Sequence, residues 1–210
     1  TNKLNKITEL TRAGIKVIFA DRALDNISTF VVKADNYKGS YELISNLIDA
    51  GHEELAFIKG PEGLSTTEER YQGYCNALKD YSIPLDKSLV KEGEFSLEGG
   101  KRAIEEILLS GLPDVVIGSN DLIAIGAMLR LQKIGYEVPG DIGVVGFDNV
   151  DLCSLIVPGL TTVNIPSYDI GKKAFQVLID MDKDAETGKD TDEEILLSTE
   201  IIKRDSCKVI

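Results

Sequence analysis

Hydrophobic and polar positions alternate between two spacings along the chain, and the two spacings predict strands and helices in turn. Short β-branched runs at 115–117 and 144–145 are each closed by a Gly, which is typical of parallel strands buried on both faces. Between them, apolar residues recur at helical spacing over 121–134. The same alternation recurs along the chain, so we predict an α/β fold with a parallel, doubly wound sheet.

The helix predicted at 121–134 has an unusually broad apolar surface. Its first two turns are apolar almost all round, which is wider than the stripe that one sheet covers. We therefore expect this helix to pack on the sheet and also on a partner chain.

Composition limits the possible functions. The chain has 210 residues and a net charge of −12, without a cluster of Lys and Arg, which argues against a nucleic-acid surface. Its three cysteines are far apart, which favours a reducing cytoplasm over a disulfide framework. No signal segment opens the sequence and no apolar run has the length of a membrane span, so we expect no membrane association.

Polar residues gather where the predicted strands end, which is where open α/β sheets bind ligands. A sugar or nucleoside needs carboxylates, amides, an arginine fork and an aromatic face around its hydroxyls and C–H groups. The strand ends and adjoining turns supply all of these types. The candidate ligand-binding residues are Asp21, Arg22, Asn36, Arg70, Phe95, Asn120 and Asp148.

The segment SNDLIAIGAMLRLQKIGYEVPGDIGVVGFDN at 119–149 resembles the signature of the lactose and galactose repressor family. Further segments agree in order and spacing: IKVIFADR, VVKADNYKG, LIDAGHEELAFIKGP, ERYQGYCNAL and LTTVNIPSYDIG. The resemblance implies a two-lobed fold like that of type I periplasmic sugar-binding proteins, with a ligand cleft between the lobes. It places 1–34 with 166–193 in a first lobe and 35–165 with 194–210 in a second, complete lobe.

The resemblance also implies parts that this sequence does not contain. In the family, three strands with their helices and a helix-turn-helix DNA-binding head come before this point. The first lobe is therefore expected to be incomplete here, with an apolar strand edge exposed at 16–20.

By resemblance, the chain is the effector-binding and dimerisation part of a cytoplasmic regulator of repressor type. The seven candidate residues would line the cleft, with a small carbohydrate or nucleoside-like effector as ligand and no cofactor. Operator DNA would be bound only through the separate head, and a phosphorylated co-regulator protein is an open alternative to the small effector. The homodimer interface is expected to include Ile125, Met128, Leu129, Leu131 and Leu155. One departure is Asn164, which is followed by Ile165 and Pro166 where several sugar-binding relatives have a glutamine.

Several candidates also have a purely structural interpretation. Asn120 and Asp121 both suit helix capping, and for Asp121 capping is the favoured role. Arg70 follows two glutamates and is as easily a solvated surface residue. Phe95 is by residue type more often a core side chain. Asp148 and Asp21 also suit turns closed by side-chain hydrogen bonds.

Other function classes have less support. The chain has one histidine, His52, and shows neither a nucleophile elbow nor a metal constellation, so we expect no enzyme and no metal site. An acidic stretch around Asp182–Glu193 has Thr187 where a calcium-binding loop requires Gly, which favours a solvated loop. An extracytoplasmic sugar-binding protein of a transporter shares the expected fold and remains the alternative.

Overall fold

The structure is a computed structural model that describes residues 2–22, 29–183 and 194–209, and it divides the chain into two units. The first unit contains Thr1–Asp35 and Pro166–Ser198, and the second contains Asn36–Ile165 and Thr199–Ile210. The chain thus passes from one unit to the other three times, at 35/36, 165/166 and 198/199. The acidic stretch from 184 to 193 lies outside the described residues. Most positions of the calcium-binding loop considered above, among them Thr187, are therefore not described.

The second unit is built on a six-stranded sheet in which all neighbouring strands are parallel except the last pair. Its order is β4-β3-β5-β6-β7-β9, and β9 runs antiparallel to β7. The strands are β3 (Leu55–Lys59), β4 (Val90–Glu92), β5 (Val115–Gly118), β6 (Gly143–Asp148), β7 (Thr161–Asn164) and β9 (Glu200–Ile202). Every residue of β5 is buried, as the apolar run predicted for a strand covered on both faces.

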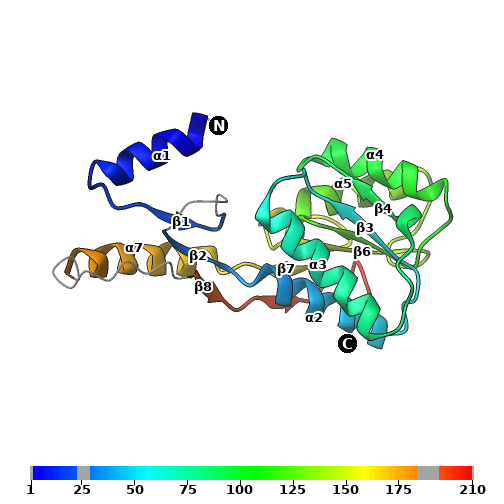
Figure 1. The fold of residues 1–210 in the computed structure, drawn as a ribbon. Helices are drawn as coiled ribbons and strands as arrows, with labels where there is room; N and C mark the ends of the chain where they lie inside the picture. The colour runs from blue at the N-terminus through cyan, green and yellow to red at the C-terminus, as the bar shows by residue number, and fades with distance from the viewer. Residues whose placement is uncertain (1, 23–28, 184–193, 210) are drawn as a thin grey trace. The chain divides into compact units, whose positions relative to one another are not determined.

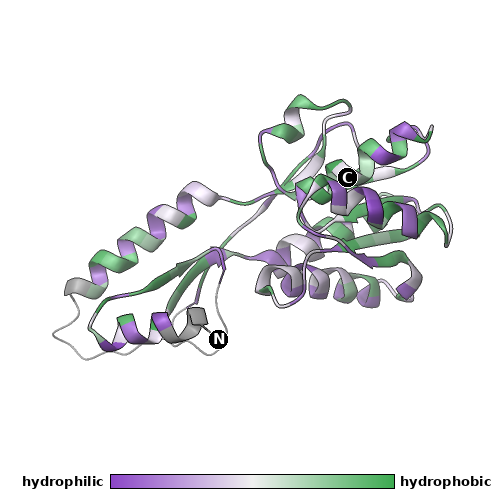
Figure 2. Cartoon of the chain, turned by 90° about the horizontal axis from the view of Figure 1, so that it is seen from above, coloured by the Kyte–Doolittle hydropathy of each residue, from purple (hydrophilic) through white to green (hydrophobic). Residues whose placement is uncertain are grey.

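Helices cover both faces of this sheet. In Figure 1, α2 (Asn36–Asp49) and α3 (Ser65–Asp80) lie on one face, and α4 (Leu97–Leu108) and α5 (Asp121–Lys133) on the other. Two short helical segments, at Lys87–Leu89 and in α6 (Leu152–Leu155), belong to connections. Figure 2 shows the strands of this sheet coloured mainly hydrophobic and the helices mixed. Because helices cover both faces of a mainly parallel sheet, the predicted doubly wound α/β architecture is confirmed.

The broad apolar surface of α5 is covered within the chain. Its side chains pack on the sheet on one side and on α4 on the other, and two glycines bring the helices close. A Cβ atom on Gly126 would lie 2.0 Å from the Leu97 carbonyl oxygen, and one on Gly100 would lie 2.0 Å from that of Ile123. Within the chain, α4 supplies the second apolar contact, so packing of this helix on a partner chain stays a prediction for its exposed Leu129.

This packing corrects part of the predicted dimer interface. Ile125, Met128 and Leu131 are at most 1% exposed and belong to the core cluster of the second unit. Side chains buried in this way cannot contribute contact area to a partner. Leu129 and Leu155 are exposed, and for them the interface remains a prediction.

The first unit, as far as it is described, contains a three-stranded parallel sheet of order β1-β2-β8. The strands are β1 (Ile18–Ala20), β2 (Phe30–Ala34) and β8 (Glu194–Leu197), accompanied by α1 (Asn2–Arg12) and α7 (Ser167–Lys183). The expected lobe boundary at 194 was wrong, because β8 pairs with β2 along its whole length and joins this unit. Asp35 also belongs here, since its N–H donates to the Leu197 carbonyl.

Replacing Gly126 by Ala should separate α4 from α5. The added methyl group has no space against the Leu97 backbone, so we expect the free energy of unfolding to fall by about 1 to 3 kcal/mol in urea denaturation. The matched control is Gly171→Ala in α7, where nothing lies within 4 Å of the added atom. That change should stabilise by up to about 1 kcal/mol through helix propensity, and equal effects of both changes would contradict the packing account.

Candidate functional site

The arginine at position 70 is the centre of a polar cluster in the second unit. Its side chain comes from α3 and the residue is only 4% exposed, so the surface interpretation was wrong. Nε donates to Asn36 Oδ1 at 3.0 Å, Nη1 to the Ser119 carbonyl at 2.6 Å and Nη2 to Asp148 Oδ1 at 2.9 Å. The guanidinium also lies 3.9 Å from the ring centroid of Phe147. One cation therefore joins the start of α2 to the carboxyl ends of β5 and β6.

The Asp148 carboxylate is the more accessible half of this pair. Its side chain is 31% exposed, whereas that of Arg70 is 5% exposed. A buried charge is tolerated only when it is paired and hydrogen-bonded, and the contacts of Arg70 meet that requirement. The pair thus presents a carboxylate held in one orientation to a solute.

The cluster is attached to two of the three chain crossings. Asn36 is the first residue of the second unit, and besides accepting from Arg70 it donates to Glu69 Oε2 at 3.0 Å. At the second crossing, the Ile165 N–H donates to the Asp148 carbonyl, with an N···O distance of 3.5 Å. Residues that could bind a ligand are therefore bonded to the segments that enter and leave the unit.

Asn120 caps the helix as expected, with its ligand-binding role still a prediction, whereas Asp121 has a different role from the one expected. Asn120 caps α5, because its Oδ1 accepts from the Ile123 N–H at 2.9 Å. Asp121, which we expected to cap, is 1% exposed and accepts from the Val150 N–H at 2.8 Å and from the Thr162 hydroxyl. The capping assignment for Asp121 was wrong, because its carboxylate points away from the helix end and across to the loop after β6.

Phe95 lies over the end of β3. A Cβ atom on Gly60 would be 2.2 Å from Phe95 Cε1, so this glycine makes room for the ring. The ring is half-buried and packs partly against the core cluster. Its proposed role as a stacking face for a ligand stays a prediction.

A group of buried hydroxyls at the same edge of the sheet was not among the candidate ligand-binding residues. The side-chain oxygens of Ser65, Thr66, Thr67 and Ser119 have no hydrogen-bond partner among the residues that the structure describes. Three of them open α3, which carries Arg70, and the fourth follows β5. The run of hydroxyl residues at a helix start was the available signal, because buried hydroxyls need partners that a polar ligand can supply.

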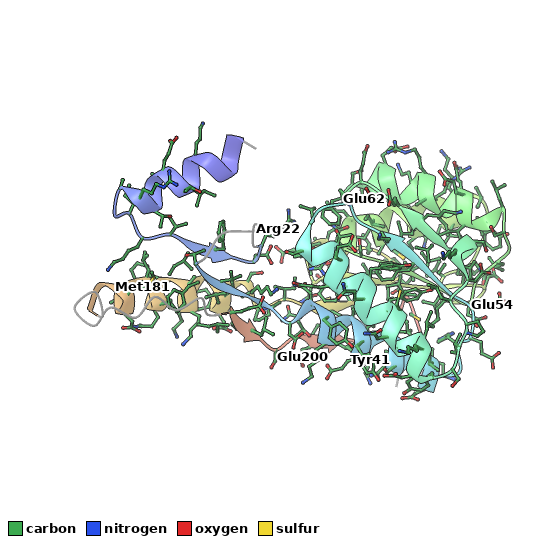
Figure 3. All side chains as sticks on the ribbon, viewed as in Figure 1. Arg22, Tyr41, Glu54, Glu62, Met181 and Glu200 are labelled. Carbon is green, nitrogen blue, oxygen red and sulfur yellow. The ribbon has the colours of Figure 1, made fainter. Side chains whose placement is uncertain are left out.

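Asp21 and Arg22 belong to the first unit. They follow β1, where Figure 3 labels Arg22, and Arg22 Nε lies 3.6 Å from Asp21 Oδ2. Asp21 has a positive φ of 71° and its N–H donates to the Val32 carbonyl. Their contribution to a ligand site stays a prediction.

Comparison with known proteins places this geometry in a family. Residues 44–207 match the family model described as "Periplasmic binding protein-like domain". The chain is 33% identical over 203 residues to the probable transcriptional repressor ExuR of Bacillus subtilis, covering 96% of this chain and 60% of ExuR. A crystal structure of a LacI regulator from Bacillus cereus superposes with a TM-score of 0.86 at 31% identity, covering 97% of this chain and 72% of that one.

The chain belongs to the LacI family. A family regulator from Enterococcus faecium, solved with bound ribose, also superposes with a TM-score of 0.86 at 29% identity, covering all of this chain and 76% of that one. The periplasmic-binding-protein-like fold inferred from the sequence is thereby confirmed. This LacI-family chain spans 60% of the length of ExuR. Within its described residues, no helix has both the length and the apolar character needed to cross a membrane.

The buried Asp121 carboxyl of this LacI-family chain has a raised pKa. Burial raises its pKa above the ordinary range, and the hydrogen bonds from Thr162 and the Val150 N–H oppose the rise only in part. Since the folded state binds the proton more tightly than the unfolded state, ionising Asp121 lowers stability as pH rises from about 4 through the raised pKa.

The change Asp121→Asn should therefore gain stability relative to wild type as pH rises. The neutral amide avoids the cost of a buried charge. The unfolding free energy of the variant minus that of wild type should therefore be more positive at pH 7 than at pH 4. Urea denaturation at both values measures this, with the exposed Asp151→Asn as control for charge removal at the surface. A difference that is independent of pH, or that moves the other way, would contradict the assigned cost of burial.

Proposed function

We propose that this chain is the effector-binding and dimerisation part of a LacI-family transcriptional regulator of repressor type. The observation that carries the proposal is the ion pair between the buried Arg70 and the partly exposed Asp148, at the carboxyl ends of β5 and β6. Its effector is a small carbohydrate or nucleoside-like compound. Operator DNA is bound by a separate helix-turn-helix head. The regulator works as a homodimer in the cytoplasm.

The residue chemistry suits a polyhydroxylated ligand. The Asp148 carboxylate accepts hydrogen bonds from sugar hydroxyls, while the buried Thr66 and Ser119 hydroxyls can donate or accept. Phe95, which lies at Gly60 near the Thr67 hydroxyl, supplies an aromatic face. Support also comes from the Enterococcus faecium relative, which was solved with bound ribose.

The contacts at the chain crossings support a mechanism of regulation. Asp148 is hydrogen-bonded to Ile165 at one crossing, and through Arg70 it is connected to Asn36 at another. A ligand that binds Asp148 therefore acts on both crossings. A ligand shifts a conformational equilibrium by its difference in affinity for the two states. We infer that effector binding is transmitted to the two segments by which the chain enters and leaves this unit, and that DNA binding reciprocally changes effector affinity.

Similarity to named repressors favours this function over the transporter alternative. ExuR and the two structural relatives are transcriptional regulators, neither transporter components nor enzymes by name. All three cysteines are free thiols, which fits a reducing compartment. A phosphorylated co-regulator protein stays a prediction from the resemblance.

The remaining dimer prediction rests on an exposed apolar surface. Leu155 is 75% exposed, and Val157 two residues further on is also exposed. Gln132 Nε2 donates to the Val157 carbonyl at 3.1 Å, so this loop lies against the end of α5, which carries the exposed Leu129. We propose that these apolar side chains form part of a two-fold interface.

The proposed effector class can be tested by ligand screening. A thermal-shift screen with D-ribose, D-glucose, D-galacturonate, glucose 6-phosphate, adenosine and hypoxanthine should give one saturable rise in melting temperature. Asp148→Asn should weaken that binding about 30-fold, or by about 2 kcal/mol, because ligand hydroxyls lose a charged acceptor. Isothermal titration calorimetry measures the affinity.

Asp151→Asn is the matched control, because it removes an exposed carboxylate in the loop after β6 and should bind as wild type does. Wild-type affinity in Asp148→Asn would exclude Asp148 from the site. If no compound of the panel shifts the melting temperature, the proposed effector class is wrong for this chain.

The proposed dimer interface can be tested by substitution at Leu155. Leu155→Lys places a charge in the proposed interface and should raise the dimer dissociation constant at least about tenfold in sedimentation analysis. Leu109→Lys, on an exposed leucine after α4, controls for loss of surface hydrophobicity. Unchanged sedimentation of Leu155→Lys, or an equal effect in the control, would remove this surface from the interface.

A further inference from the structure

The chain bends sharply where β6 ends, at the residue that faces Arg70. Asp148 has a φ of 115° and Asn149 a φ of 59°, so two consecutive residues other than glycine occupy the left-handed region. Residues with a side chain seldom adopt such values, and they keep them only where the surroundings hold them. The direction of the Asp148 carboxylate therefore depends on whatever holds this bend.

One side of the bend is held by the C-terminal segment and β7. Arg204 Nη2 donates to Asn149 Oδ1 at 2.8 Å, and its Nη1 donates to the Leu160 carbonyl at 2.7 Å. Asn149 Nδ2 in turn donates to Asn164 Oδ1 at 3.0 Å. Arg204 thus bridges the bend and the residue that precedes β7.

The other side is held from the start of α5. Asp121 Oδ2 accepts from the Val150 N–H at 2.8 Å, directly after the bend, and Oδ1 accepts from the Thr162 hydroxyl of β7. Gly146 makes this possible, because a Cβ there would lie 2.3 Å from Asp121 Oδ1. A buried carboxylate and a cation therefore restrain two consecutive residues, Asn149 and Val150, and neither Asp121 nor Arg204 belongs to the Arg70 cluster.

We propose that Asp121 and Arg204 are positioning residues for effector binding, which hold the left-handed bend at Asp148–Asn149 and thereby set the Asp148 carboxylate against Arg70. The proposal rests on the proposed function for its biological meaning. Asp121 is buried and does not meet the solute, so it acts only through Asp148. Without the two restraints the bend relaxes toward negative φ, and Asp148 turns away from Arg70.

The test uses the ligand-free chain, so it does not depend on which effector binds. Two NMR signals are measured: the one-bond Cα–Hα couplings of Asp148 and Asn149, which report the sign of φ, and rotation of the Arg70 guanidinium about its Nε–Cζ bond. Asp121→Ala and Arg204→Gln should each lose the positive-φ couplings. They should also speed the Arg70 rotation by about tenfold or more, because a charge-assisted hydrogen bond is lost.

Asp121→Asn should restore both signals, because an amide oxygen still accepts from Val150 and the Thr162 hydroxyl can accept from the amide. This rescue separates positioning from a need for charge. If Asp121→Ala does not fold, Arg204→Gln and Asn149→Ala decide the question. Asn149→Ala removes the anchoring amide but keeps a Cβ atom, which disfavours positive φ, and it should give the same two changes.

Two controls test whether the effect is specific. Asp114→Ala removes a carboxylate that accepts from the Glu53 and Glu54 N–H groups before β3, and Lys203→Gln removes the exposed cation beside Arg204. Both controls should keep the two wild-type signals, even where thermal unfolding shows a loss of stability. Unchanged signals in Asp121→Ala and Arg204→Gln, or equal changes in the controls, would overturn the proposal. Failure of the effector screen would leave these signals unaffected and would count only against the proposed function.

Discussion

The candidate site depends on the burial of one cation, the guanidinium of Arg70. A charge that is this deeply buried is stable only with a full set of partners, and these come from three separate parts of the chain. Asn36, Ser119 and Asp148 must all reach it at once. The positions of α2, β5 and β6 relative to α3 are therefore constrained by this group, and its partner Asp148 keeps a carboxylate that is partly exposed.

The fold makes this arrangement possible through parallel strands and close helix packing. Parallel strands end at one edge of the sheet, so residues that follow β5 and β6 meet there although they are far apart in sequence. Gly100 and Gly126 let α4 approach α5 closely, which fixes the helix whose first residue is Asp121. Asp121 then restrains the loop that carries Asp148, so core packing and site geometry are connected.

Local patterns in the sequence predicted the strands, the helices and the polar strand ends, because these follow from spacing and residue type. They could not predict which distant groups meet. Arg70 gave no sign of burial, since its partner Ser119 lies 49 positions away. The apolar surface of α5 suggested a partner chain, because spacing does not say that α4 covers it. Asp121 resembled a cap since only the three-dimensional position of Val150 distinguishes the two roles.

The most direct test of the account is a crystal structure of this chain with the compound that gives the largest thermal shift. We expect ligand hydroxyls within hydrogen-bond distance of Asp148, at the carboxyl ends of β5 and β6. We also expect that Asp148 and Asn149 keep positive φ in the complex. A ligand bound elsewhere, or one that leaves Asp148 paired only with Arg70, would contradict the central claim.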